Sequence, residues 1–372
     1  MNRPQIPFFN YPALFAVREK ELMDTVRSVF SQGRLIMQRE LSQFETNLAA
    51  FLGVRHVIGV ANGTDSIMFG LMACGIERGD EVILPSHTFI ATGSAIHFAG
   101  GTPVLVDCRD DHLLDPNAVR KAVTGRTRAI VPVQLNGRTA QMDKLMTLAT
   151  ERGFVVIEDS AQALGAKFMG RNAGTFGKAG SFSFYPAKLL GCYGDGGCVV
   201  TDDDELASIV RSLRDHGRTA DGDVRGWSFN SRLDNVQAAL LDLKLKTLQR
   251  DIERRREIAS MYQERLGEVD ELLLPPGPDS DSRYFDVFQN YEVECASRDE
   301  LRQHLAEAGV GTIIQWGGKG IHQFPRLGFD VSLPITERVM ERSFLLPMNT
   351  SLSDDDVLYI CDTVASFFGV HV

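Results

Sequence analysis

Residues Phe154 to Asp159 read Phe-Val-Val-Ile-Glu-Asp, a short apolar run with β-branched residues that ends in two acids. Similar runs precede it, separated by segments with helical periodicity such as Met142 to Arg152. These runs are Glu81 to Leu84, Val104 to Asp107 and Ala129 to Val133. Short apolar strands that alternate with helices, here between about residues 54 and 201, are typical of βαβ units. The pattern therefore predicts an α/β domain whose mostly parallel sheet is covered by helices on both faces.

A second, smaller domain is expected because 372 residues exceed what one ordinary core needs. The stretch Leu274 to Ser282, rich in proline and flanked by small polar residues, predicts a loop. After it the pattern predicts one strand and two helices, over Tyr284 to Cys295, Asp299 to Ala308 and Asp354 to Phe368. We expect a large domain over residues 1–250 and a smaller α+β domain over residues 251–372.

Several helix boundaries can be predicted from their end residues. Leucine and phenylalanine recur at helical spacing from Leu41 to Phe51, and Gly53 follows as a stop. A helix from Thr64 to Cys74 is expected to begin at Thr64 or Asp65 and to end before Gly75. One long amphipathic helix is expected from about Asp234 into the 260s.

The composition is that of an ordinary globular enzyme, with 44% hydrophobic and 24% charged residues. A formal net charge of -10 argues against nucleic acid or an anionic membrane as a partner. No apolar run is long enough to span a bilayer, and residues 1–10 do not resemble a signal peptide. The six cysteines form no C-x-x-C pair and no cluster with zinc spacing, so we expect reduced thiols, a cytoplasmic location and no metal site.

Two segments present groups with chemical potential. Asp159 and Gln162 follow the strand that ends at Asp159, and ligands of such sheets sit beyond the carboxyl ends of the strands. The segment Ser181 to Lys188 predicts a strand that delivers Lys188 into the glycine-rich turn Gly191 to Gly197. Taken singly, Asp159 could be a helix cap and Lys188 a surface lysine.

A third segment, Ala61 to Asp65, lies between a predicted strand and a predicted helix. The free N–H groups at a helix start form a natural phosphate site. Gly63 would allow a close approach, and the hydroxyl groups of Thr64 and Ser183 could add hydrogen bonds. An ordinary capped turn is the alternative interpretation.

Together the three segments supply what pyridoxal phosphate requires, which is a phosphate site, an acid for the pyridine nitrogen and a lysine for the aldehyde. Asp159 would keep the pyridine nitrogen protonated, and Lys188 would form the Schiff base and then shuttle the proton. The ordinary lysine pKa of about 10.4 is too high for that role, so we expect burial and the cofactor to lower the pKa of Lys188.

At these residues the chain resembles the DegT/DnrJ/EryC1/StrS family of sugar aminotransferases, which have the fold-type-I architecture of aspartate aminotransferase. The resemblance covers nearly the whole chain and holds in sequence order. It rests on Gly33-Arg34, Phe44-Glu45, Gly63-Thr64-Asp65, Gly79 to Ser86, Glu158-Asp159 with Gln162, Ser183 to Pro186 with Lys188, Gly194 to Gly197, Asn230 to Asp234 and Gln237 to Ala239.

The resemblance implies a role for each matching position. Lys188 matches the Schiff-base lysine, Asp159 the partner of the pyridine nitrogen, and Gln162 the residue near the ring hydroxyl. Phe89 matches the aromatic residue that covers the ring. The phosphate ligands correspond to Gly63, Thr64, Ser183 and Asn230, of which Asn230 is supplied by the partner subunit, with Arg232 close by.

Two segments depart from the usual family pattern. Many members have Pro-Val-His-Leu-Tyr-Gly where this chain has Pro-Val-Gln-Leu-Asn-Gly over residues 132–137, and many have His-Tyr-Pro near Gln315. Both segments resemble sugar-facing parts of the family site, so these changes leave the sugar undetermined. Candidate substrate contacts are Tyr185, Arg232, Gln315, Trp316 and His322. A packed aromatic residue and a surface histidine remain the alternatives for Trp316 and His322.

The resemblance implies a homodimeric, pyridoxal-phosphate-dependent transaminase. It would move an amino group from an amino acid, with glutamate as the expected donor, to a nucleotide-linked 3-keto or 4-keto sugar through the pyridoxamine form of the cofactor. One alternative is a pyridoxamine-phosphate-dependent sugar dehydratase, whose relatives carry histidine at the position of Lys188. Another is a non-catalytic regulatory homologue, which the complete set of Asp159, Gln162, Ser183 and Lys188 disfavours.

Overall fold

The apolar runs form the centre of a seven-stranded sheet in the computed structural model, which describes residues 5–370. The strand order is β1-β9-β8-β5-β4-β2-β3, and β9 runs antiparallel to both its neighbours while the other pairs are parallel. The strands are β1 (His56–Val60), β2 (Glu81–Pro85), β3 (Thr102–Val106), β4 (Thr127–Ile130), β5 (Val155–Asp159), β8 (Ala179–Ser183) and β9 (Gly197–Thr201). The predicted fold class is confirmed.

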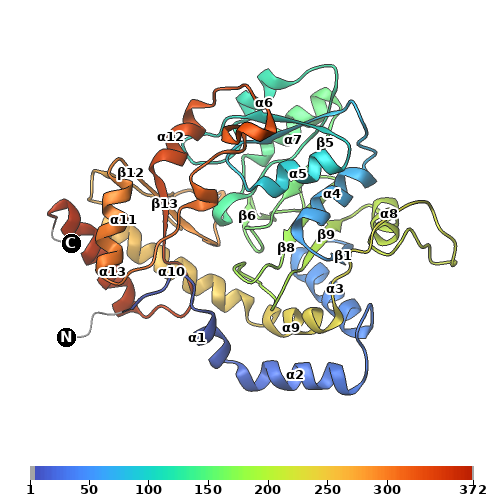
Figure 1. Cartoon of the computed structure of the whole chain (residues 1–372), viewed down its shortest axis with the longest axis horizontal. Helices are drawn as coiled ribbons and strands as arrows, with labels where there is room; N and C mark the ends of the chain where they lie inside the picture. Colours follow the sequence, from blue (N-terminus) through green and yellow to red (C-terminus); the bar gives the residue numbers. More distant parts are fainter. Residues whose placement is uncertain (1–4, 371–372) are drawn as a thin grey trace.

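Helices cover both faces of this sheet, because apolar side chains leave its strands on both sides (Figure 1). One face packs on α4 (Gly63–Ala73), α5 (Ile90–Phe98) and α8 (Asp204–Arg214). The other face packs on α3 (Arg39–Leu52), α6 (Pro116–Ala122), α7 (Met142–Arg152) and α9 (Asn235–Leu245). The alternation shows within single strands, since Ile58 and Val57 of β1 belong to opposite cores.

A separate core lies at the C-terminal end of the chain. The antiparallel sheet β10-β12-β13 packs on α10 (Leu248–Leu266), α11 (Arg298–Glu307) and α13 (Asp354–Phe368). Its strands are β10 (Leu272–Leu273), β12 (Tyr291–Cys295) and β13 (Ser343–Leu346). Helix α12 (Pro334–Arg342) precedes β13. A small third sheet joins β6 (Lys167–Phe168), β7 (Arg171–Asn172) and β11 (Tyr284–Phe285). The predicted domain boundary near residue 250 falls at the start of α10 and stays a prediction.

The structure corrects three predicted elements. The single helix expected from Asp234 is two helices, because α9 ends at Leu245 and α10 begins at Leu248. The strand expected over Tyr284 to Cys295 divides into β11 and β12, since Asp286 to Asn290 cross to the large sheet's side and bind there. Helix α4 begins one residue earlier than expected, capped by Asn62, whose Oδ1 accepts from the N–H of Asp65 at 2.8 Å.

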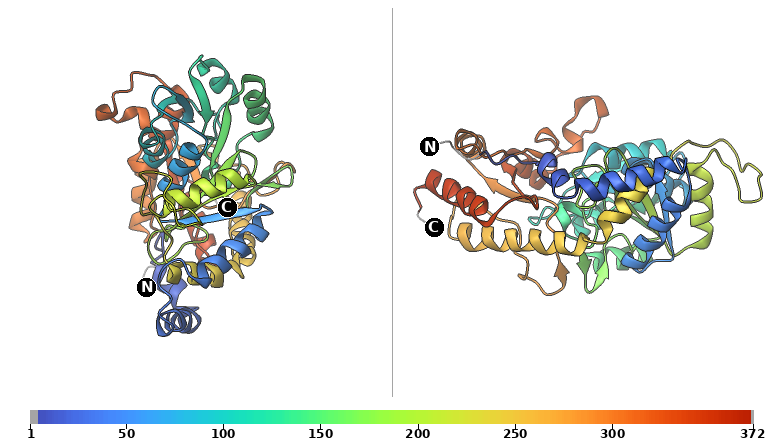
Figure 2. Two further views of the ribbon diagram at one scale, coloured as in Figure 1. Left: turned by 90° about the vertical axis from the view of Figure 1, so that its right-hand side faces the viewer. Right: turned by 90° about the horizontal axis from the view of Figure 1, so that it is seen from below.

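Two segments stand out from the body of the molecule in Figures 1 and 2. Helix α1 (Tyr11–Ala16) leads into α2 (Glu19–Ser31), which packs along α9. After α8, the loop over residues 215–230 projects away from the large sheet. Within residues 5–370, no helix is both long and apolar enough to cross a membrane.

Candidate active site

The carboxyl ends of neighbouring strands gather the predicted site residues. Asp159 ends β5, and the chain leaves β8 at Ser183 to reach Lys188 five residues later. Phe89 lies between β2 and α5, and Gly63 begins α4 directly after β1. Since β1, β2, β5 and β8 all point the same way, their ends and the loops that follow them share one edge of the sheet.

Asp159 is a buried carboxylate held in a fixed orientation. Its Oδ2 accepts from the hydroxyl of Thr92 at 2.7 Å, and its Oδ1 accepts from the N–H of Ala161 at 3.1 Å. Burial raises the pKa of Asp159, while these two hydrogen bonds and the charge of Lys188 partly oppose that rise. Thr92 was not identified from the sequence, because its position in α5 becomes relevant only when that helix packs beside β5.

Lys188 lies in the turn after β8, where its side chain is partly buried. Its backbone N–H donates to the carbonyl of Tyr185 at 2.8 Å, which closes the turn that contains Pro186. Burial lowers the pKa of Lys188 to about 8, and the negative charge of Asp159 opposes part of that shift. The expectation that burial lowers this pKa is confirmed, and a fraction of the amine is therefore neutral near pH 7.

The turn before α4 is shaped for a small anion. A Cβ on Gly63 would lie 2.8 Å from the Cβ of Ser183, so a larger residue would push this turn away from β8. Asn62 caps the N–H of Asp65, and the N–H groups of Gly63 and Thr64 belong to the helix start that has no intrahelical partner. A phosphate beside these groups would also lie near the hydroxyl of Ser183, at the end of β8.

Gln162 is oriented by the turn that replaces the usual family sequence. Its Oε1 accepts from the backbone N–H of Asn136 at 2.8 Å, so the amide NH₂ remains the donor that can face a ligand. Asn136 has a φ of 55°, a left-handed conformation that asparagine tolerates better than most residues. Gln134 lies in the same segment but is buried, where its amide donates to Glu158 at 2.7 Å and its Oε1 accepts from the N–H of Ala140.

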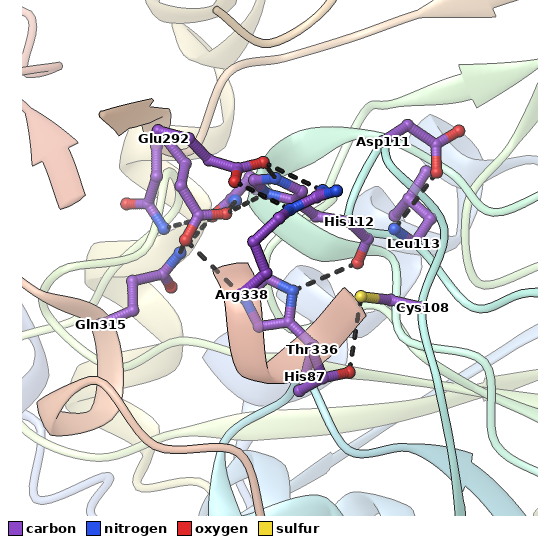
Figure 3. Close-up of polar contacts among 12 residues, drawn as sticks. His87, Cys108, Asp111, His112, Leu113, Glu292, Gln315, Thr336 and Arg338 are labelled. Carbon is purple, nitrogen blue, oxygen red and sulfur yellow. Dashed lines mark hydrogen bonds and ion pairs between the residues drawn. The ribbon is translucent and has the colours of Figure 1, made fainter. Parts of the chain in front are cut away.

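Gln315 belongs to a polar network at the seam between the two main sheets, drawn in Figure 3. Its amide donates to Oδ1 of Asn136 at 3.0 Å and to Oε1 of Glu292 at 3.1 Å. The ring of Trp316 packs edge-on against His87 with centroids 5.3 Å apart. The loop that contains Gln315 is thereby joined to the turn at Asn136, whose N–H orients Gln162.

His322 is buried, so its interpretation as an ordinary surface histidine is wrong. Its Nδ1 lies 2.7 Å from the hydroxyl of Ser86, and its Nε2 lies 3.3 Å from a carboxylate oxygen of Glu337. Both ring nitrogens are thus paired inside the protein. A contact between His322 and the substrate stays a prediction.

Four other predicted residues lie on open surface or at its margin. Phe89 and Tyr185 are each 53% exposed, although both flank Asp159 and Lys188 in sequence or space. Asn230 is exposed beside Asp215, and Arg232 forms an ion pair with Asp215 at 2.9 Å. Exposed aromatic rings next to the buried Asp159 and the partly buried Lys188 indicate a candidate site that is open on one side.

The chemistry of this donor set fits pyridoxal phosphate. The close approach of Gly63 and Ser183 suits the phosphate, the buried carboxylate of Asp159 suits the pyridine nitrogen, and the Lys188 amine suits the aldehyde. Gln162 has a donor to spare for the ring hydroxyl. The residues that sequence reasoning missed, Thr92 among them, orient these groups from neighbouring elements.

Comparison with known proteins gives a family match over most of the chain. The sequence model of the DegT/DnrJ/EryC1/StrS aminotransferase family matches residues 17–365. A curated relative from Streptomyces venezuelae, named dTDP-3-amino-3,4,6-trideoxy-alpha-D-glucose transaminase, is 38% identical over 97% of this chain and 96% of its own length. Another, from Geobacillus stearothermophilus and named pleiotropic regulatory protein, is 37% identical over 98% of each chain.

The fold matches a solved structure equally well. The crystal structure of DesV from S. venezuelae in complex with a ketimine intermediate superimposes with a TM-score of 0.94 and 37% sequence identity. The match covers 99% of this chain and 100% of that one. The two chains therefore share their fold over almost their whole lengths.

Proposed function

Since the chain belongs to the DegT/DnrJ/EryC1/StrS aminotransferase family and is a pyridoxal-phosphate enzyme, we propose that it aminates a nucleotide-linked keto sugar. The amino group would come from an amino acid, with L-glutamate as the expected donor. The observation that carries this proposal is the pairing of the partly buried Lys188 with the buried Asp159 beside the exposed rings of Phe89 and Tyr185. The S. venezuelae relative, whose name specifies a 3-amino sugar, supports a 3-keto sugar as the first substrate to test.

When bound, pyridoxal phosphate supplies an aldehyde that exchanges amino groups and a ring that withdraws electrons. Lys188 would hold the cofactor through its amine, which would also take up and return the transferred proton. Asp159 would keep the pyridine nitrogen protonated through its negative charge, and the hydrogen bonds from Thr92 and Ala161 fix the direction of its carboxylate.

The remaining cofactor ligands act by position. Gln162 would donate to the ring hydroxyl, because its oxygen is already engaged by the N–H of Asn136. Gly63, Thr64 and Ser183 would hold the phosphate, and Phe89 would pack against the cofactor ring. On the substrate side we propose contacts from Tyr185, Arg232, Gln315, Trp316 and His322.

We further propose a homodimer in which Asn230 completes the phosphate site of the partner. The exposed apolar residues support this, because large exposed apolar patches mark association surfaces. Met23 and Phe30 on α2 are 47% and 55% exposed, and Trp227 in the projecting loop is fully exposed. An isologous pairing would cover these groups in both copies. A cytoplasmic location is consistent with six free cysteines.

Two other functions are less well supported. A pyridoxamine-phosphate-dependent dehydratase has no need of the amine of Lys188. A regulatory role has the name of the Geobacillus relative in its favour, but a regulator without catalysis does not need a lysine with a pKa near neutrality.

The test is a panel assay with the purified holoenzyme. Glutamate is incubated with nucleotide-linked 3-keto and 4-keto sugars, and release of 2-oxoglutarate is followed together with the mass of the amino sugar. We expect turnover with at least one member and none with Lys188→Ala. Loss of oxygen from the sugar without transfer of nitrogen would identify a dehydratase, and binding of all sugars without turnover would favour the regulator.

A further inference from the structure

Two histidines and a glutamate from distant parts of the chain meet at the seam shown in Figure 3. His87 follows β2, His112 lies in the loop after β3, and Glu292 is in β12 of the C-terminal sheet. One nitrogen of each ring and one carboxylate oxygen all lie within 4.8 Å of one another. His87 and Glu292 are 1% and 2% exposed, so water does not readily satisfy them.

The ring of His87 has an unpaired nitrogen that faces this cluster. Its Nδ1 lies 3.3 Å from the carbonyl oxygen of His112, which can only accept, so in the neutral ring the proton belongs on Nδ1. Its Nε2 then presents a lone pair, 3.7 Å from Oε1 of Glu292 and without a hydrogen-bond partner among residues 5–370. An unprotonated Nε2 and a carboxylate oxygen are both acceptors, so this buried place suits a positive charge, either a proton on Nε2 or a bound metal ion.

His112 and Glu292 form further hydrogen bonds that orient them, as metal ligands usually do. Nε2 of His112 lies 2.9 Å from Oε1 of Glu294, which leaves Nδ1 turned to Oε2 of Glu292 at 2.8 Å. Glu292 also accepts from the amides of Asn136 and Gln315, at 2.8 Å and 3.1 Å. A carboxylate or carbonyl behind each imidazole is the arrangement that fixes metal-binding histidines.

The charges around the cluster favour a cation. Glu292 and Glu294 each place a carboxylate oxygen against a ring nitrogen of His112, at 2.8 Å and 2.9 Å. In the absence of a metal ion, His112 and Glu292 share a proton across the first of these contacts. A metal ion would displace that proton, because a ligating imidazole nitrogen must be deprotonated.

We propose that His87, His112 and Glu292 bind one Zn²⁺ ion at the seam. Two imidazole nitrogens and one carboxylate are a donor set that zinc accepts, whereas Mg²⁺ and Ca²⁺ prefer oxygen ligands. Zinc lies about 2.0–2.2 Å from such ligands, so tetrahedral ligand atoms are about 3.3–3.6 Å apart and the outermost pair here would close by up to about 1.5 Å. A cavity of about 350 Å³, lined in part by His112, Asn136 and Glu292, reaches the cluster and provides the entry path.

The ion would join both main sheets. His87 and His112 belong to loops of the seven-stranded sheet, and Glu292 belongs to the C-terminal sheet, so one ion would link three segments that are distant in sequence. Because a folded-state ligand stabilises by mass action, zinc should raise the melting temperature of the protein. The sugar amination proposed above does not depend on this site.

The test measures metal content, with untagged holoenzyme dialysed against micromolar ZnCl₂ or MgCl₂. We expect about one zinc per chain by atomic emission, no magnesium, and a higher melting temperature with zinc. His87→Asn should lose zinc while keeping the cofactor, whereas His97→Asn should bind zinc as the wild type does, because His97 is exposed on α5. Equal zinc in wild type and His87→Asn, or no zinc in either, would overturn the proposal.

A second variant keeps all three proposed ligands. Glu294→Gln should weaken zinc binding by roughly 10–100-fold, since it removes the carboxylate behind His112. If Glu294→Gln binds zinc as tightly as the wild type, zinc is bound elsewhere and the proposal is wrong.

Discussion

Lys188 with Asp159 at the strand ends and His112 with Glu292 at the seam are both pairs of opposite charges taken out of water. Burial moves the first pair toward neutrality, since it raises the pKa of Asp159 and lowers that of Lys188 to about 8. In the second pair the shifts are opposite, since the pKa of His112 is raised and the pKa of Glu292 is lowered. Contact with His112 and His87 outweighs burial and holds the pKa of Glu292 well below its usual range.

The difference lies in contact. His112 and Glu292 lie 2.8 Å apart, whereas Lys188 and Asp159 influence each other through charge without a hydrogen bond between them among residues 5–370. Burial penalises charge, and a direct partner restores it. Groups left near neutrality can exchange protons near pH 7, while groups fixed in their charged forms hold elements together. The first pair is suited to chemistry and the second to structure.

The largest expected effect comes from Lys188→Ala. Turnover should fall by about 10³-fold or more, since proton transfer by a placed side chain alone contributes roughly 10²–10⁴-fold. The melting temperature should change little. The measurement is 2-oxoglutarate release, with borohydride and peptide mass spectrometry to show that cofactor mass is absent. Lys178→Ala, an exposed lysine in the turn before β8, is the control; equal loss in both variants would contradict the comparison.

Glu292→Gln should destabilise the fold instead. Breaking a buried ion pair costs about 3–5 kcal/mol, and here the loss leaves His112 with Glu294 as its remaining carboxylate. Urea unfolding with chelator present measures this without metal. Glu300→Gln removes the same charge from an exposed site and should stay within about 0.5 kcal/mol of the wild type. If Glu292→Gln is as stable as that control, the seam pair does not hold the sheets.

Asp159→Asn should lower turnover much more than stability, in contrast to Glu292→Gln. Turnover should fall by roughly 10²–10³-fold, because an amide lacks the charge that holds the ring proton, while stability should change by less than for Glu292→Gln. The measurements are kcat and the unfolding free energy of the same preparation. Asp195→Asn, in the exposed glycine turn, serves as the control. Near-normal turnover would show that Asp159 only orders the backbone at Ala161.

The smallest expected effect is on the pH dependence of stability in cofactor-free protein. The pKa of His112 is raised to about 10 from about 6.5 unfolded, so its stabilisation is complete below pH 6.5 and is lost as pH rises toward 10. The pKa of Lys188 is lowered to about 8 from about 10.4, so its penalty disappears over pH 8–10 and opposes that loss. Melting temperatures should therefore fall with pH more steeply in Lys188→Ala than in the wild type above pH 8. If the melting temperatures of the two proteins change with pH in parallel, the pKa values of His112 and Lys188 are not shifted in opposite directions.

Much of the fold was predictable because it depends on local patterns. The apolar runs gave β2 to β5, Gly53 ends α3 in a left-handed conformation, and the last helix spans Asp354 to Phe368 as expected. The break between α9 and α10 was not predictable from helical periodicity, because Lys246 and Thr247 do not interrupt the amphipathic pattern.

The functional residues likewise fall into a predictable group and an unpredictable group. Lys188, Asp159 and Gly63 lie in short motifs at strand ends, where chemistry and local structure coincide. The seam could not be predicted, because His87, His112 and Glu292 are separated by up to about 200 residues and none lies in a motif. Sequence spacing identified no metal site for that reason. Their approach depends on how the C-terminal sheet docks, and only tertiary packing determines that.

Asn136 connects the candidate substrate contact Gln315 to the candidate cofactor ligand Gln162. Its backbone N–H positions Gln162, while its side chain is held by Glu292, Gln315 and Asn290 from the C-terminal part of the chain. A substrate that displaces Gln315 would therefore turn the amide of Gln162, which we propose to face the ring hydroxyl of the cofactor. We expect the visible absorption of the bound cofactor to shift when a sugar nucleotide binds, before any nitrogen is transferred, and Asn136→Ala to blunt that shift. The colour of the enzyme would then report the docking of its substrate.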